Sequence, residues 1–390
     1  MKLLFIQGGS RIRINSKNEY YVDGNFNNEV FDDYYKLADS VTFVLRVDTN
    51  KYTDDFLEKK FNKLDSKFNI VLVDDIMGSL KKYFNIKSRK KIRSTIEREV
   101  IAADRIIIRH VGSYYSNECY KLCLKHKKQF LLEVPGPTFE GTWNHSLKGK
   151  FYALPQELRV KKAIKKSPYC VYVTEDALQK RYPCNGISLG CSDVRIFEYN
   201  DEKISNKVFD CTKKINIINI GFYDVKWKGQ KDLIKAIKIL KKEDPARDYN
   251  VSFVGSGNGL ALKKLVKKLD LESNIKFLGS VQHHEIFNLL DNADLYVQTS
   301  YSEGLCRSIV EAMSRGLPVV CSDVGGNYEL VSDKCLYPKK NVRCLVKSLK
   351  SIDDCFLNEN SKINYEKSKK YASDVLSQKR DEFYLKFMNL

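Results

Sequence analysis

The sequence lacks any apolar run near the roughly 18 residues that a membrane-spanning helix requires, which argues against an integral membrane protein. Its first apolar run, residues 1–9, is too short for a signal peptide, and we expect a first strand there. The 11 cysteines form no CxxC pair, so we expect reduced thiols in a cytoplasmic protein. Only five histidines are present, which argues against a histidine-rich metal site.

Acidic residues are too few to balance the basic ones. The chain carries 67 Lys and Arg against 49 Asp and Glu, a net charge of +18. The excess is concentrated in residues 81–166, which hold 21 basic residues against 7 acidic ones. An anionic membrane surface or a nucleic acid would satisfy this charge, and a solvated lysine-rich surface is a third explanation.

Strands and helices alternate through both halves, which predicts an α/β protein with two parallel-sheet domains and a cleft between them. We place the domains at residues 1–196 and 214–372, with a polar linker over 197–213 and a last helix over 373–390. Apolar runs predict strands at 2–7, 40–47, 69–73, 105–109, 129–134, 169–174, 215–220, 249–254, 276–279, 294–298 and 319–323. Gly8 and Gly9 are expected to end the first strand, and residues 79–102 to form one basic helix.

The stretch 300–313 is the most informative part of the sequence. It follows the strand predicted at 294–298, passes through a tight loop at Gly304, and then takes on helical spacing from Leu305. A helix entered in this way points backbone N–H groups and its positive dipole end at one spot, which suits a phosphate. Glu303 and Glu311 stand eight residues apart, so we expect both on the helix face that looks into the cleft. Two carboxylates beside a phosphate suit sugar hydroxyls.

This spacing, with its surroundings, resembles the E-x7-E signature of retaining glycosyltransferases of family 4. The surrounding matches are Asp294-Leu295, Gly316-Leu317-Pro318 and Gly325-Gly326. Two glutamates alone would more often be solvated helix acids, so these matches carry the resemblance. It implies a GT-B fold, with two Rossmann-like domains and a final helix that crosses back to the first. It also implies that the second domain binds the nucleotide-sugar and the first binds the acceptor.

A second match, Lys228-Gly229, lies where the family places a lysine near the donor diphosphate. The family often has an arginine after Gly221, but Phe222 stands there, and Arg307 is a candidate for the missing charge. The resemblance implies Glu303, Lys228 and Arg307 as catalytic residues. The implied donor-binding residues are Gly304, Leu305, Cys306, Ser308, Glu311, Lys226 and Val281.

In the first domain, the resemblance implies Gly8, Gly24, Asn25 and Arg109 as candidates for the acceptor side of the cleft, although the glycines and Asn25 could equally be turn residues. Pro135 stands where the family commonly has a histidine. His110, after the preceding strand, is not at the matching place, so we assign no catalytic histidine.

The resemblance implies transfer of a hexose from a nucleotide diphosphate-sugar to a saccharide hydroxyl, with retention at the anomeric carbon. No Asp-x-Asp motif follows a strand, so we expect neither a metal nor a cofactor. The basic first domain favours a lipid-linked acceptor in surface polysaccharide assembly, with the enzyme peripheral on the inner face of the cell membrane. The alternatives are a nucleotide-sugar 2-epimerase of GT-B type and a nucleic-acid-binding α/β protein. The latter is disfavoured because the basic stretch 81–93 has few aromatic rings for base stacking.

Overall fold

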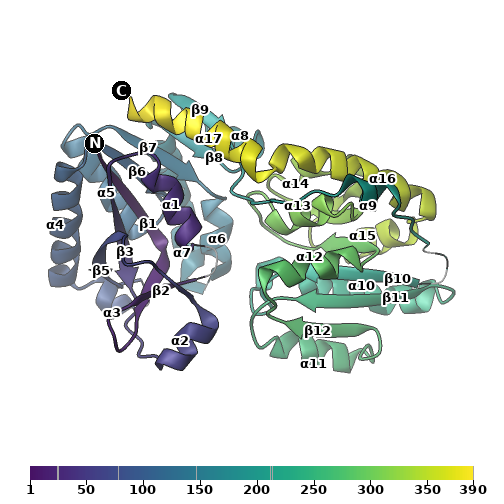
Figure 1. Ribbon diagram of the computed structural model, residues 1–390. Coiled ribbons are helices and arrows are strands. Elements are labelled where there is room, and N and C mark those ends of the chain that lie inside the picture. The colour runs from purple at the N-terminus through teal and green to yellow at the C-terminus, as the bar shows by residue number, and fades with distance from the viewer. Residues whose placement is uncertain (24–25, 78, 146, 211, 213, 390) are drawn as a thin grey trace.

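The computed structural model describes the whole chain except residues 24, 25, 78, 146, 211, 213 and 390. Helices and strands alternate along both halves, and each half builds a sheet of its own. In Figure 1 the two sheets stand side by side with helices around each, and the yellow C-terminal helices run from the second half back to the first. The predicted pair of parallel-sheet α/β domains is therefore confirmed.

The first domain is built on a parallel sheet in the order β5-β3-β1-β6-β7-β8-β9, and two short strands pair antiparallel beyond it. Its strands are β1 (Lys2–Ile14), β2 (Tyr20–Val22), β3 (Ser40–Val47), β4 (Asn62–Lys63), β5 (Asn69–Asp74), β6 (Arg105–Arg109), β7 (Phe130–Val134), β8 (Tyr169–Tyr172) and β9 (Ile187–Gly190). Helices cover both faces, so central strands are continuous apolar runs, and Ile106, Ile107 and Ile108 are fully buried.

The first strand does not end at Gly8 and Gly9 as predicted, but continues to Ile14. Its register with β3 shifts between Ile6 and Arg11, and its last residues then gain a new antiparallel partner in β2. Gly8 is buried, and a Cβ atom there would lie 2.3 Å from Ser113 Oγ. A glycine therefore lets the strand pass close to Ser113, the N-cap of helix α5 (Tyr114–Lys125).

Four helices of the first domain, α1, α2, α4 and α5, begin at capped positions, where Asn27, Thr53, Asn85 and Ser113 each accept a backbone N–H bond. They are α1 (Asn28–Tyr35), α2 (Asp54–Lys60), α3 (Leu80–Tyr83), α4 (Ile86–Ala102), α5 (Tyr114–Lys125), α6 (Thr138–His145), α7 (Leu147–Lys165) and α8 (Ala177–Arg181). The basic helix predicted over 79–102 is thus two helices, because the Asn85 side chain accepts from Ser88 N and starts a new one.

The second domain is a parallel sheet in the order β12-β11-β10-β13-β14-β15. Its strands are β10 (Lys214–Ile220), β11 (Asp248–Val254), β12 (Ile275–Gly279), β13 (Leu295–Gln298), β14 (Val319–Asp323) and β15 (Leu336–Pro338). Its helices are η1 (Lys226–Lys228), α10 (Gln230–Glu243), α11 (Leu260–Lys268), α12 (His283–Asp291), α13 (Arg307–Ser314), α14 (Asn327–Leu330), η2 (Asp333–Cys335), α15 (Val342–Lys350) and α16 (Asp354–Ser368). A short helix, α9 (Asp201–Ser205), lies within the predicted linker.

The chain returns to the first domain through η3 (Lys369–Tyr371) and α17 (Ser373–Met388). Ala372 forms a β-bridge with Ile196, and the Tyr384 hydroxyl donates to Glu133 Oε1 at 2.5 Å. The rings of Phe383 and Phe387 pack against Tyr169. The final helix therefore crosses back to the first domain, as the predicted fold requires (Figure 1).

A carboxylate of the second domain caps a helix of the first. Glu329 of α14 accepts hydrogen bonds from the backbone N–H groups of Glu175, Asp176 and Ala177, at 2.7, 3.1 and 2.7 Å. The Asp176 side chain does not cap α8 itself, and its Oδ2 accepts from the Tyr328 hydroxyl at 2.6 Å. These bonds fix the two domains relative to each other on this side.

We predict that Glu329→Ala lowers the free energy of unfolding by about 1–3 kcal/mol, because three backbone donors lose their acceptor. Glu329→Gln, which keeps one acceptor oxygen, should lose less. Thermal melting measures both against Glu366→Ala, which removes an exposed ion pair with Lys369 and should cost at most about 0.5 kcal/mol. A melting temperature for Glu329→Ala equal to that of Glu366→Ala would contradict this role.

Candidate active site

The loop between β13 and α13 carries most of the predicted site residues. Leu305 and Cys306 are buried and precede the helix, which begins at Arg307. The Cys306 side chain makes no cap bond, so it does not satisfy the N–H groups of the first helical turn. Burial raises the pKa of the Cys306 thiol to about 11, which keeps it protonated. The structure thus places an uncapped helix N-terminus after this loop, and its use for an anion stays a prediction.

Glu303 is not on the helix, contrary to the prediction that it shares a helix face with Glu311. The chain turns helical only after Cys306, so Glu303 lies in the preceding loop. Its Oε1 accepts hydrogen bonds from Lys228 Nζ at 2.7 Å and from Ser300 Oγ at 2.6 Å. The loop, not helical periodicity, therefore sets the direction of this carboxylate.

The ion pair between Lys228 and Glu303 is largely buried, with the two side chains 19% and 12% exposed. Burial alone would lower the pKa of Lys228, but the charge and hydrogen bond of Glu303 outweigh it and raise that pKa. Lys228 is therefore a fixed cation at neutral pH. It ends the η1 turn, and the following Gly229 takes a φ of +67° to start α10.

Buried hydrogen bonds connect the loop between β13 and α13 to its two flanking elements. The Tyr296 hydroxyl contacts Gln298 Oε1 at 2.6 Å and Ser308 Oγ at 2.7 Å, which ties the end of β13 to the first turn of α13. Gln298 Nε2 in turn donates to Ser300 Oγ at 2.7 Å. Ser308, a predicted donor-binding residue, is thus positioned by a tyrosine of the neighbouring strand.

Glu311 lies on α13 with its side chain 13% exposed, and His283 Nε2 is 3.3 Å from its Oε1. The hydrogen bond to Glu311 raises the pKa of His283, and Glu29 of the first domain acts in the same direction. His283 was not among the predicted site residues, because its position depends on a contact between α12 and α13 that no local pattern in the sequence marks.

Arg307 connects the loop to the first domain electrostatically. Burial alone would raise the pKa of Asp193, but Arg109 and Arg307 lower it. The Arg307 side chain is exposed at the start of α13. Arg307 begins α13, and Lys228 is close enough to Cys306 and Arg307 to interact electrostatically with both, so both cations lie near the α13 N-terminus. Their contact with a donor diphosphate stays a prediction.

Two glycines allow backbone segments to approach the Glu303 loop closely, one between the two domains and one within the second domain. A Cβ on Gly304 would lie 2.5 Å from the Pro135 carbonyl oxygen of the first domain. Gly325, with a φ of +54°, would place a Cβ 2.1 Å from the Glu303 carbonyl oxygen. Pro135, which stands where a histidine was expected, therefore packs against the loop that carries Glu303.

Arg109 is held by acidic partners. Its guanidinium donates to Glu133 Oε2 and to Asp193 Oδ2, both at 2.7 Å. Burial alone would lower the pKa of Arg109, but these two carboxylates raise it. Arg109 therefore joins the ends of β6 and β7 to the segment after β9, and an acceptor contact from it stays a prediction.

The remaining predicted residues lie at the edges of the site. Lys226 is exposed at the start of η1, and Val281 is half-buried between β12 and α12. Gly8 lies close to the start of α5, as described above, and its acceptor role also stays a prediction. Gly24 and Asn25 lie outside the described residues.

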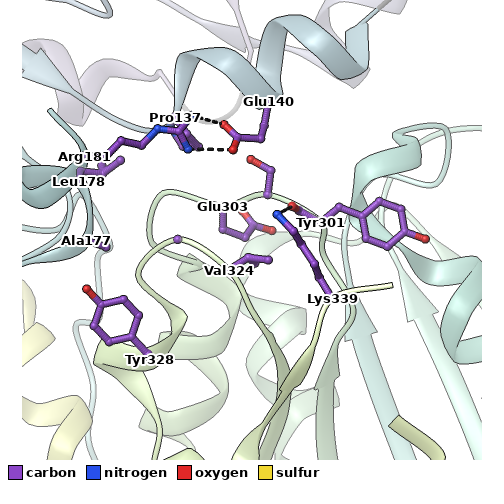
Figure 2. A pocket seen from close by; sticks show the side chains of 12 residues that line it. Pro137, Glu140, Ala177, Leu178, Arg181, Tyr301, Glu303, Val324, Tyr328 and Lys339 are labelled. Atoms are coloured by element: carbon purple, nitrogen blue, oxygen red, sulfur yellow. Dashed lines mark hydrogen bonds and ion pairs between the residues drawn. The ribbon is translucent and has the colours of Figure 1, made fainter. Parts of the chain in front are cut away.

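Next to Glu303, a pocket of about 230 Å³ opens between the domains (Figure 2). One wall comes from the first domain, where Arg181 pairs with Glu140 at 2.8 Å. Opposite it, Lys339 Nζ reaches the Tyr301 carbonyl oxygen at 3.5 Å. The lining is Pro137, Glu140, Ala177, Leu178, Arg181, Tyr301, Ser302, Glu303, Val324, Gly325, Tyr328 and Lys339. This polar lining suits hydroxyl-rich ligands.

Two further properties concern the described part of the chain. No group of three or more His, Cys, Asp or Glu side chains is arranged there to hold a metal ion. No helix there has the length and apolarity to cross a bilayer.

The chain is similar in sequence to known proteins. The family model "Glycosyl transferases group 1" matches residues 200–370, which include the Lys228 turn and the whole β13–α13 unit. Protein CapJ of Staphylococcus aureus is 32% identical over 85% of this chain and 81% of its own length. The amylovoran biosynthesis glycosyltransferase AmsK of Erwinia amylovora is 31% identical over 37% of this chain and 38% of its own.

Among solved structures, the chain is similar to Alr3699/HepE of Anabaena in complex with UDP-glucose. The TM-score is 0.65 at 17% sequence identity, over the full length of both chains. At this identity the likeness shows the fold alone, and it confirms the predicted GT-B architecture.

The contact between His283 and Glu311 should change the pH at which His283 titrates. We expect the pKa of His283 to lie above its usual value of about 6.5, and Glu311→Gln to lower it. Because the folded state favours protonated His283, the pair's stabilising contribution is present below about pH 6.5 and is lost as pH rises through the raised pKa. NMR titration of the ring signal, assigned with His283→Gln, measures this. An unchanged His283 pKa in Glu311→Gln would show that the pair does not form.

Proposed function

The chain belongs to the glycosyl transferases group 1 family, and from this premise we propose that it is a retaining hexosyltransferase. It moves a sugar from a nucleotide diphosphate-sugar to a hydroxyl group of a saccharide. The observation that carries the proposal is the convergence of the α13 N-terminus, the Lys228–Glu303 pair and Glu311 at one end of the second sheet. This set combines charge for a diphosphate with carboxylates for sugar rings.

In the proposed donor complex, the diphosphate lies at the α13 N-terminus, against the backbone N–H groups from Leu305 to Ser308. Glu311 accepts hydrogen bonds from the ribose hydroxyls, and Val281 lies beside the base. Glu303, steadied by Lys228 and Ser300, accepts from hydroxyls of the transferred sugar. Each carboxylate then recognises a different ring of the same donor.

In the transfer step, the bond between the anomeric carbon and the leaving phosphate oxygen breaks. The acceptor hydroxyl oxygen bonds to the same carbon on the same face, and its proton passes to the leaving phosphate. Lys228, Arg307 and the helix N–H groups stabilise the charge that builds on the diphosphate. We expect these groups, and not a divalent metal, to neutralise it. No separate base and no covalent carboxylate intermediate are required.

We extend the proposal to a lipid-linked saccharide acceptor in surface polysaccharide assembly, used by an enzyme peripheral on the inner face of the cell membrane. Support comes from AmsK, whose name describes amylovoran biosynthesis, and from the basic first domain. Transfer is favoured over 2-epimerisation because the matching family and AmsK are both named as glycosyltransferases.

We predict that Lys228→Ala and Glu311→Ala each lower kcat/KM for transfer by about 100- to 1000-fold, because each removes a group that contacts the donor. A panel of labelled UDP-sugars measures the rate, as transfer to a saccharide or as acceptor-independent release of UDP. Formation of an isomeric UDP-sugar without acceptor would instead indicate the epimerase.

Lys235→Ala and Glu272→Ala are matched controls, because both side chains are exposed on the same domain. They should keep the wild-type rate, and circular dichroism should show that all four variants are folded. A wild-type rate in Lys228→Ala or Glu311→Ala would remove that residue from the site.

A further inference from the structure

Large apolar side chains are exposed along one face of α7. Phe151, Leu154 and Leu158 are 84%, 58% and 58% exposed, and their spacing of three and four residues puts them on one stripe. They are not needed to pack the helix on its own domain. Ala153, Val160 and Ile164 form the inward face and are at most 3% exposed.

The same outer face becomes basic in the last two turns. Lys161, Lys162 and Lys165 are exposed there. The acid of this helix, Glu157, points inward, is 5% exposed, and accepts from Arg181 and from the Tyr182 hydroxyl. The exposed face of α7 therefore combines apolar bulk with positive charge and no neighbouring acid from its own helix.

The junction of α3 and α4 adds to this surface. Phe84 and Ile86 are 58% and 67% exposed, and Lys81, Lys82 and Lys87 are exposed around them. The start of α5 links the two elements. The Tyr83 ring of α3 lies 5.9 Å from the Tyr114 ring, between centroids, and Arg159 of α7 donates to the Gly112 carbonyl oxygen at 3.0 Å.

We propose that this docking surface, made of Phe84, Ile86, Phe151, Leu154 and Leu158 with their surrounding lysines, binds an anionic lipid bilayer. Apolar side chains would enter the boundary between headgroups and acyl chains while lysines meet the phosphates. A bilayer fits because exposed apolar side chains and uncompensated positive charge occur together. A nucleic acid would use the charge and leave Leu154, Leu158 and Ile86 without a role.

The docking surface is close to the mouth of the cleft. Gln156 and Arg159 of α7 donate to the Gly112 carbonyl oxygen at 2.8 and 3.0 Å, in the loop that follows β6. Helix α6, which precedes α7 in the chain, begins shortly after the Pro135–Gly136 segment that contacts Gly304. A bilayer held there would bring a lipid-linked saccharide to the site. This benefit rests on the proposed function, whereas the lipid binding itself does not.

The test is flotation of the full chain with vesicles of phosphatidylcholine, alone or mixed with phosphatidylglycerol. We expect binding to the mixed vesicles only. Binding should be weaker by about 10- to 100-fold in the triple variant Phe151→Ser/Leu154→Ser/Leu158→Ser. A similar loss is expected in the triple variant Lys161→Gln/Lys162→Gln/Lys165→Gln. Raised salt should weaken binding of the wild type and of the apolar variant.

Matched controls lie on the second domain. Lys264→Gln/Lys267→Gln/Lys268→Gln removes equal charge from exposed positions of α11, and Leu260→Ser/Ile363→Ser removes side chains that are 62% and 55% exposed. Both should bind vesicles as the wild type does. If the controls weaken binding equally, attraction is due to net charge alone and the proposed surface is wrong.

Two other results would overturn the proposal. One is absence of binding to the mixed vesicles, which would show that this surface contacts only solvent. The other is binding to single-stranded nucleic acid that survives the three serine substitutions while vesicle binding is absent. Thermal stabilisation by UDP, GDP or ADP, measured on the same samples, distinguishes the two proposals. Vesicle binding without stabilisation by any of these diphosphates would count against the sugar transfer alone. Stabilisation by one of them without vesicle binding would count against the docking surface alone.

Discussion

The candidate site depends on how closely the Glu303–Gly304 backbone approaches the first domain. Gly304 lies against Pro135, and Gly325 lies against the Glu303 carbonyl, at separations that leave no space for a Cβ. This contact fixes the loop from two sides, and the Tyr296 and Gln298 hydrogen bonds fix it from below. A side chain at either glycine would push the loop away, and with it the carboxylate of Glu303.

The site also requires that the ammonium group of Lys228 stays charged although it is largely buried. A buried ammonium is costly unless it is paired, and Glu303 supplies the partner that keeps Lys228 charged. An arriving diphosphate can then share a cation that is already ordered, so little reorganisation is needed when charge builds on the leaving group. Glu311 and His283 form a second pair, in which the His283 side chain is more exposed than that of Lys228.

Much of this could be predicted from sequence because parallel α/β domains have continuous apolar strands and a ligand edge at their carboxyl ends. The central strands and the β13–α13 loop followed from that pattern. The direction of Glu303 did not, because it depends on Cys306 being the N-cap, and spacing alone suggested a longer helix. The extension of β1 and the break at Asn85 depend on pairing and capping between residues whose contacts appear only in the fold. His283 depends on a contact between separate helices, and nothing local marks it.

The central claim is that the α13 N-terminus, with Lys228 and Glu311, holds a nucleoside diphosphate. Its most direct test is thermal melting of the unmodified protein with UDP, GDP and ADP, the matching monophosphates, and NAD. The account predicts that one diphosphate raises the melting temperature in proportion to the logarithm of its concentration above Kd, and more than its monophosphate does. Equal responses to monophosphate and diphosphate, or no response to any nucleotide except NAD, would contradict it.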